Sequence, residues 1–483
     1  VAFGSLWLQV SGLIGKDGIM PATDLMSQAR RFVDAEAMGL GRFHLLPTLC
    51  WFGAPDWFLR LQCGAGCGLA LLLMAGVAQP LCLGLLWVLY LSLTSVGSDF
   101  LAFQWDNLLL ETGFLAIFLA PCQWLPQPSR ERAPPGTAIW LLRVLLFKLM
   151  FLSGVVKLTS EDSSWRNLSA LSYHYQTQPL PTWIAWYAAQ LPLWFQKASC
   201  ALMLLIELVV PFLIFLPRRV RLFGAAALAL LQILILLTGN YTYFNWLTLA
   251  LCLLLCDDFF LGRFWPWKRS SPVQDKTAPP SAWGLANRAM RALVAFVFIG
   301  LALIQISVAL GQDPSWLRPA RALERWLGPF RTVNSYGLFA VMTTERPEII
   351  VEGSVDGQVW NEYQFPYKPG DLTRRPRFVA PFQPRLDWQM WFAALGTYRQ
   401  NPWFLDFCVR LLQNSPDVVK LLQVNPFPAS PPRYVRAQRY EYRFTTLEER
   451  ARTGAWWKRS YRGIYLPPVS LEMLQKAQRL PKP

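Results

Sequence analysis

The chain has 483 residues, of which 53% are hydrophobic and 16% are charged, whereas charged residues make up roughly 25% of a typical soluble protein. Its formal net charge is +16, but many of the basic residues flank apolar runs, where they set membrane orientation and meet anionic lipid. The sequence has no glycine-rich phosphate loop and no zinc-finger spacing. Composition and motifs therefore indicate an integral membrane protein and exclude a nucleic-acid partner.

Nine apolar segments follow one another along the first two thirds of the chain. They span residues 1–14, 59–78, 81–97, 100–120, 138–158, 195–216, 222–238, 243–261 and 291–310. A transmembrane helix needs about 20 residues, so the short first segment is expected to be the second half of a first helix. The sequence predicts a polytopic α-helical membrane protein with about nine transmembrane helices.

Basic residues between these segments predict the orientation, because short cytoplasmic loops are rich in Lys and Arg. The basic loops contain Arg130 and Arg132; Arg218, Arg219 and Arg221; and Arg263, Lys268, Arg269, Lys276, Arg288 and Arg291. All three fall on one side if each segment crosses once, which places the N-terminus in the cytoplasm. Residues 16–58, 159–194 and 239–245 then lie on the other side, although Arg30, Arg31, Arg42 and Arg60 oppose the rule there.

The same orientation predicts four parts of the chain. They are a helical membrane bundle (1–262), a basic cytoplasmic linker (263–290), a last transmembrane helix (291–310) and a non-cytoplasmic mixed α+β domain (311–483). In this domain we expect a hairpin of strands 348–354 and 359–367, helices over 385–423 broken near Pro402 and Pro416, and a strand at 434–445. The sequons at Asn167 and Asn240 fall on the non-cytoplasmic side and are candidate glycosylation sites.

Polar residues inside the apolar segments are the candidate functional cluster. They are Gln104, Asp106, Asn107 and Glu111 in the fourth segment, Lys148 in the fifth and Glu207 in the sixth. Helical rise places Glu111 about 16 Å and Lys148 about 15 Å deep, which predicts a buried Lys148–Glu111 pair, with Glu207 also at a matching depth. An unpaired acid at this depth costs several kcal/mol. The cluster is either a polar, proton-handling site or a clamp between helices.

Several runs resemble the lipase maturation factor family. They are 103–114 (FQWDNLLLETGF), 149–160 (LMFLSGVVKLTS), 173–175 (YHY), 238–241 (TGNY), 334–339 (NSYGLF) and 384–396 (PRLDWQMWFAALG). The resemblance implies a multi-pass endoplasmic reticulum membrane protein without a cofactor that acts as a chaperone for secreted dimeric lipases. Its clients would meet the domain after residue 311, and its bundle would contact membrane lipid. Animal members carry more sequence between the linker and the C-terminal domain, and a bacterial source would place the protein in the plasma (inner) membrane.

A second, more distant resemblance is to the membrane domain of vitamin K-dependent gamma-carboxylase. It rests on 153–158 (SGVVKL), Trp165 and residues 173–175, and it implies an enzyme with Lys157 as the base and with Asp106 and His174 as further candidates for the same site. The alternative for Lys157 is snorkelling of a lysine at a helix end. A third possibility is a membrane-anchored binding module. No metal site is expected, because His174 and the other histidine, His44, lack neighbouring ligands in the sequence.

Overall fold

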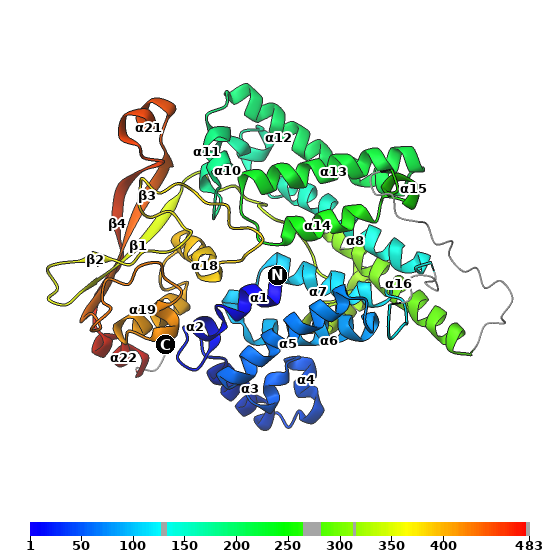
Figure 1. The fold of residues 1–483 in the computed structure, drawn as a ribbon, viewed down its shortest axis with the longest axis horizontal. Coiled ribbons are helices and arrows are strands. Elements are labelled where there is room, and N and C mark those ends of the chain that lie inside the picture. The colour runs from blue at the N-terminus through cyan, green and yellow to red at the C-terminus, as the bar shows by residue number, and fades with distance from the viewer. Residues whose placement is uncertain (127–132, 264–281, 313–314, 480–483) are drawn as a thin grey trace.

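The computed structural model describes residues 1–126, 133–263, 282–312 and 315–479. A helical bundle forms most of the molecule, and a small sheet stands at one end of it, on the left in Figure 1. Part of the orientation argument lies outside the described residues, as does most of the linker predicted at 263–290. The basic residues concerned are Arg130, Arg132, Lys268, Arg269 and Lys276.

Within the described residues, the bundle contains sixteen α-helices. They are α1 (Ala2–Trp7), α2 (Val10–Ile14), α3 (Ala22–Ala35), α4 (Arg42–Leu45), α5 (Asp56–Met74), α6 (Gln79–Val96), α7 (Gln104–Ile117), α8 (Gly136–Thr159), α9 (Ser163–Arg166), α10 (Ala170–Thr177), α11 (Trp183–Ala189), α12 (Leu193–Leu208), α13 (Arg218–Thr238), α14 (Phe244–Leu253), α15 (Asp258–Leu261) and α16 (Ala282–Ala309). Among the described residues, six are long and apolar enough to cross a membrane: α5, α6, α8, α12 with its 3-10 continuation, α13 and α16.

The predicted number of about nine spans is therefore not confirmed, because six of the described helices are long and apolar enough by themselves to cross. Segment 1–14 divides into α1 and α2, segment 100–120 retains only the 14 residues of α7, and segment 243–261 retains the 10 residues of α14. The helix α7 begins only after a 3-10 turn at Ser98–Leu101, and α14 follows a turn in which Thr242 has a φ of 57°. Apolar sequence continues into these turns, so hydropathy alone overestimates the helix lengths.

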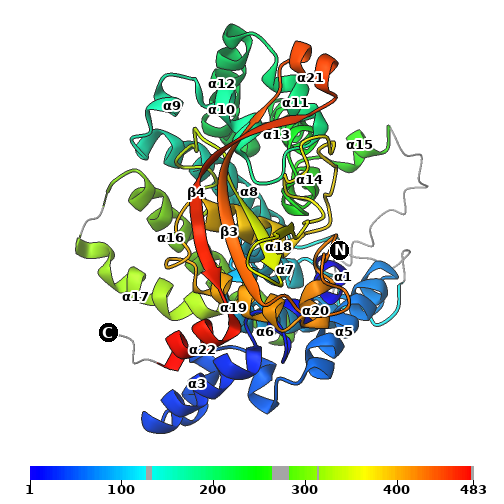
Figure 2. The same cartoon turned by 90° about the vertical axis from the view of Figure 1, so that its left-hand side faces the viewer.

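The C-terminal part is a mixed α+β domain. Its sheet has the order β2-β1-β3-β4 with antiparallel neighbours. The strands are β1 (Pro347–Ser354), β2 (Asn361–Glu362), β3 (Tyr434–Phe444) and β4 (Trp457–Val469), and the helices are α17 (Arg318–Leu327), α18 (Arg385–Ala394), α19 (Pro402–Leu412), α20 (Pro416–Val419), α21 (Leu447–Thr453) and α22 (Leu471–Arg479). Figure 2 faces the sheet, with the long strands β3 and β4 in front of the bundle.

Most of the predicted elements of this domain are present. Strands β1 and β3 and the helix starts at Pro402 and Pro416 match the prediction. The predicted strand 359–367 shortens to β2, because the backbone N–H groups of Tyr367 and Lys368 donate to the Asp387 carboxylate (2.9 and 2.8 Å) instead of to a neighbouring strand. Strand β4 was missed.

The domain packs directly on the bundle from both sides of its sheet. Helices α18 and α19 share a continuous apolar core with α1, α2 and strands β1 and β3. On the other face, Trp186 of α11 packs with Ile350, Tyr442 and Trp457. Figure 1 shows α1 and α18 side by side where the two parts meet, and Gln9 of the α1–α2 break bonds to the Gln383 carbonyl (2.8 Å) and the Arg385 N–H (3.0 Å).

A close backbone approach between α2 and α20 in this junction gives the first prediction. A Cβ on Gly12 would lie 2.3 Å from the Asp417 carbonyl oxygen, whereas a Cβ on Gly68 of α5 would meet nothing within 4 Å. We expect Gly12→Ala to destabilise the protein by about 1–3 kcal/mol through overpacking, and Gly68→Ala to be neutral or stabilising by up to about 1 kcal/mol. Thermal unfolding in detergent measures both. Equal melting temperatures for the two variants would contradict the contact between α2 and α20.

Candidate functional site

The four polar side chains predicted in the fourth segment lie on α7, and each contacts the C-terminal part of the chain. Asp106 and Glu111 form ion-pair clusters described below. Gln104 Oε1 accepts a hydrogen bond from the Gly337 N–H (3.1 Å), and Asn107 Oδ1 accepts one from Arg331 Nη1 (2.9 Å). These polar groups therefore face protein rather than lipid.

Asp106 binds Arg385, the first residue of α18. The guanidinium donates from Nη2 to Oδ1 (2.9 Å) and from Nη1 to Oδ2 (3.1 Å), a bidentate geometry. The hydroxyls of Tyr90 (2.5 Å) and Tyr243 (2.8 Å) also donate to Oδ1. Both charged side chains are buried, at 0% and 1% exposure. The carboxylate is thus held by groups from α6, the turn before α14 and the C-terminal domain.

Glu111 forms the buried pair that the depth argument predicted. Its Oε1 lies 2.5 Å from Lys148 Nζ of α8, and both side chains are fully buried. Its Oε2 accepts hydrogen bonds from the Tyr336 hydroxyl (2.5 Å) and the Asn334 N–H (2.9 Å). The Lys148 ammonium also lies over the rings of Phe298 and Tyr336. Helices α7, α8 and α16 and the run 334–339 therefore meet at one carboxylate.

Glu207 does not join Lys148 but pairs with Lys157. The distance from Lys157 Nζ to Glu207 Oε2 is 2.7 Å, and Nζ also donates to the Ser153 carbonyl (2.9 Å). Lys157 is 4% exposed, so the interfacial snorkelling interpretation is wrong for this residue. The reason is that α12 presents a counter-charge to α8 inside the bundle.

His174 lies beside the Lys157–Glu207 pair. All three line a cavity of about 340 Å³ whose other walls are mostly apolar. The ring of His174 contacts the Tyr241 hydroxyl through Nε2 (3.1 Å). Burial, and then the charge of Lys157, lower the pKa of His174 to about 4, so the imidazole is neutral at physiological pH. Asp106 does not line this cavity, and the three candidate catalytic residues are therefore not assembled into one site.

The two sequon asparagines have different surroundings. Asn167 is exposed, and its glycosylation stays a prediction. Asn240 is 2% exposed; its Nδ2 donates to the carbonyls of Arg377 (2.8 Å) and Leu180 (3.0 Å), and its Oδ1 accepts from the Val379 N–H (2.7 Å). A glycan on Nδ2 would have to displace these contacts, so the folded protein leaves no room for one.

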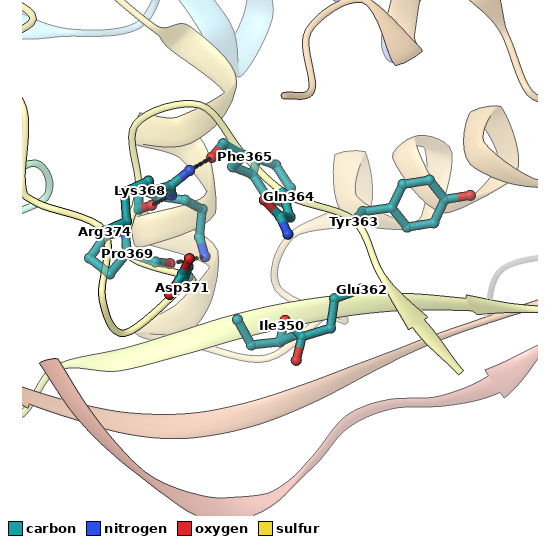
Figure 3. Close-up of a pocket in the computed structure, with 10 residues that line it drawn as sticks. Ile350, Glu362, Tyr363, Gln364, Phe365, Lys368, Pro369, Asp371 and Arg374 are labelled. Atoms are coloured by element: carbon teal, nitrogen blue, oxygen red, sulfur yellow. Dashed lines mark hydrogen bonds between the residues drawn. The ribbon is translucent and has the colours of Figure 1, made fainter. Parts of the chain in front are cut away.

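A small pocket in the C-terminal domain lies above β1 (Figure 3). Its volume is about 10 Å³, which is room for about one water molecule. Lys368 is engaged by Glu348 (3.0 Å), and Arg374 donates to the carbonyls of Phe365 and Lys368. Burial raises the pKa of the nearby Asp387 to about 6, although hydrogen bonds from the backbone N–H groups of Lys368 and Tyr367 lower it. Among the described residues, no group of three or more His, Cys, Asp or Glu could hold a metal ion.

Sequence reasoning missed the partners that the C-terminal part supplies. Arg331, Asn334, Tyr336 and Arg385 were not candidate site residues, although two of the family-like runs contain three of them. One sequence feature could have identified Arg385: it is a basic residue at the start of a mostly apolar, Trp-rich helix. Its partner Asp106 lies 279 residues earlier in the chain.

Comparisons with known proteins match the chain over nearly its whole length. Residues 1–263 match a family model described as the lipase maturation factor transmembrane domain, and residues 332–467 match the lipase maturation factor C-terminal domain. Lipase maturation factor 2 of Gallus gallus is 38% identical over 97% of this chain and 79% of its own length, and that of Homo sapiens is 38% identical over 97% and 80%. Lipase maturation factor 1 of Bos taurus is 34% identical over 98% and 87%. No solved structure matches.

The Glu111 cluster gives the second prediction. Glu111→Leu strands the Lys148 ammonium in the bundle, so we expect a loss of about 3–5 kcal/mol of stability. The double variant Glu111→Leu/Lys148→Leu should recover much of this loss. It should not recover all of it, because the Tyr336 hydroxyl and the Asn334 N–H still lack their acceptor, at about 1–3 kcal/mol for each unsatisfied group.

Adding Tyr336→Phe to the double variant removes one of these unsatisfied donors and should raise its stability further. Thermal unfolding of the purified variants in detergent gives their order of stability. A double variant no more stable than Glu111→Leu alone would mean that the ion pair is not what holds α7 to α8.

Proposed function

Because the chain belongs to the lipase maturation factor family, we propose that it is an integral membrane protein that helps secreted lipases to fold and assemble. The observation that carries this proposal is the family match over both the bundle and the C-terminal domain. It is supported by relatives named lipase maturation factor that share 33–38% identity with almost the entire chain. The match favours neither of the alternatives, a carboxylase-like enzyme with Lys157 as base or a membrane-anchored binding module.

The polar cluster on α7 acts in this proposal as a clamp rather than a proton-handling site. Asp106 and Glu111 each receive a full set of donors, one of them a cation, and both are shielded from water. Removing one partner of such a pair is costly, so the cluster fixes the C-terminal domain against the bundle. A domain that is held rigidly on the membrane can present a stable surface to a folding client protein.

The client-facing surface in this proposal belongs to the C-terminal domain. Strand β4 is an edge of the sheet, and Tyr461 and Ile464 on it are more than half exposed. Exposed aromatic and apolar side chains beside an open strand edge are features that unfolded or partly folded chains bind. Lys458 and Arg462 of β4 are exposed beside them.

We place this domain on the non-cytoplasmic face of the membrane, which in animal relatives would be the lumen of the endoplasmic reticulum. Five hydrogen bonds support that orientation, because each joins the domain to a segment that the basic loops predict on the same face. The orientation requires the shorter apolar segments 100–120 and 243–261 to cross the membrane as well as the six long helices. Residues 17 and 18 contact Ser415 and Arg410, Gln176 contacts Arg346, Thr177 contacts Trp391, and Asn240 contacts Arg377.

Orientation is the third prediction. Cys122, between α7 and α8, is the exposed cysteine among the nine, all of which the structure describes as free thiols, and it lies on the predicted cytoplasmic side. In sealed vesicles with the cytoplasmic face outward, a membrane-impermeant maleimide should label Cys122. In a Cys122→Ser background, Arg462→Cys on β4 should be labelled only after detergent is added. Labelling of both positions in intact vesicles would put the C-terminal domain in the cytoplasm.

Client maturation is the fourth prediction. In cells that lack their own lipase maturation factors, expression of this chain should raise the activity of a secreted dimeric lipase per unit of secreted lipase protein. A secreted protein that is not a lipase should be unaffected. The proposal fails if the lipase activity equals that with an empty vector while the chain is present in the membrane.

A Lys157→Arg variant is the matched control for the enzyme alternative. Arginine keeps the charge opposite Glu207 and has the adjoining cavity to occupy, but it retains its proton and cannot act as a base. We expect this variant to mature the lipase as the original chain does. Loss of maturation at normal expression and thermal stability would support the carboxylase-like alternative.

A further inference from the structure

The largest cavity described above is unused by the clamp and by the proposed client surface. It lies between α8, α10, α11, α12, α13 and α14, and its volume of about 340 Å³ falls within the range of roughly 300–1,000 Å³ that small-molecule sites occupy. Leu149, Met203, Leu231 and Phe339 are among its many apolar lining residues. A largely apolar lining of this size suits the hydrocarbon part of a ligand.

One wall of the cavity is polar, and the Lys157–Glu207 pair forms it. The side chains of the pair are 5% and 7% exposed, and both line the cavity. Lys157 donates to Glu207 Oε2 and to the Ser153 carbonyl, so the ammonium has two acceptors among the described residues and three protons. Glu207 Oε1 accepts no hydrogen bond from the described residues. The pair can therefore offer one donor and one acceptor to a ligand.

The net charge of this wall determines which kind of ligand head group can bind beside it. The lysine and the glutamate cancel each other, and the neighbouring His174 is neutral at physiological pH because burial keeps its pKa near 4. A charged head group would enter an apolar cavity without a counter-charge, which is costly. An uncharged hydroxyl group can accept from Lys157 and donate to Glu207 without that cost, whereas a carbonyl group could only accept from Lys157.

The rim of the cavity indicates where a ligand enters. Leu191, just before α12, and Phe195, in its first turn, are 40% and 42% exposed. Leu234 and Leu237, near the end of α13, are 50% and 40% exposed. All four line the cavity, and α12 and α13 are candidate membrane spans. An apolar rim between two spans opens towards the hydrocarbon of the bilayer rather than towards water.

We propose that this cavity binds an uncharged, hydroxyl-bearing amphiphile from the membrane, such as a monoacylglycerol. Its head hydrogen-bonds to Lys157 and Glu207, and its acyl chain lies along the apolar lining and leaves between α12 and α13. The proposal goes beyond lipase maturation, because the cavity shares no residue with the α7 clusters or with β4.

The test uses the full chain in phosphatidylcholine nanodiscs and a photoactivatable monooleoylglycerol as probe. Mass spectrometry should locate the cross-links on cavity-lining peptides of α8, α12 and α13. Unlabelled monooleoylglycerol should compete with the probe, whereas lysophosphatidic acid, which is anionic, should compete at least roughly tenfold less well, a difference of about 1.4 kcal/mol. Equal competition by both would overturn the neutral head group.

A matched pair of variants on α12 tests the cavity itself. Ser199 lines the cavity, whereas Ala201, two residues on, is exposed on the outer face of the helix. Ser199→Phe should reduce labelling roughly tenfold, and Ala201→Phe should leave it unchanged. Equal labelling of the two variants would mean that the probe only coats the outer surface. If Ser199→Phe does not fold, Ala188→Phe fills the cavity from α11 and carries the same expectation.

Discussion

The bidentate contact between Asp106 and Arg385 is the constraint on which the rest of the structure depends. A carboxylate in an apolar helix has to be neutralised, and here the cation comes from α18, the helix that packs against the central strand β1. The same contact draws in hydroxyls from α6 and from the turn before α14. One buried charge thus fixes the positions of the sheet domain and of three parts of the bundle together.

The two buried pairs of the bundle have different surroundings, and the difference separates their roles. Glu111 and Lys148 are both fully buried, and side-chain and backbone donors surround the carboxylate. Lys157 and Glu207 are 2.7 Å apart, but both border the cavity. The first pair holds helices α7 and α8 together, and the second forms a polar part of the wall of a largely apolar cavity.

The membrane class, the strands at 348–354 and 434–445 and the Lys148–Glu111 pair could be predicted from the sequence, because hydropathy, alternation and helical depth are local properties. The partners of Asp106, Asn107 and Glu207 could not. Arg385 and Arg331 come from a domain more than 220 residues away. Glu207 packs beside Gly154 of α8, more than one helical turn from Lys148, so the depth match with Lys148 was wrong. Helix lengths failed for α7 and α14 because turns there are as apolar as the helices. Strand β4 was missed since it alternates poorly and contains Pro467 and Pro468.

The separation of 279 residues between Asp106 and Arg385 has a consequence for biosynthesis. The ribosome synthesises α7 long before α18. Asp106 therefore has no Arg385 to pair with until most of the chain has been translated. The membrane part is completed only when the last domain arrives. A premature stop codon before residue 385 would therefore do more than delete most of the sheet. It would leave the Asp106 carboxylate without its cation among the membrane helices, and membrane quality control degrades proteins with such exposed polar groups.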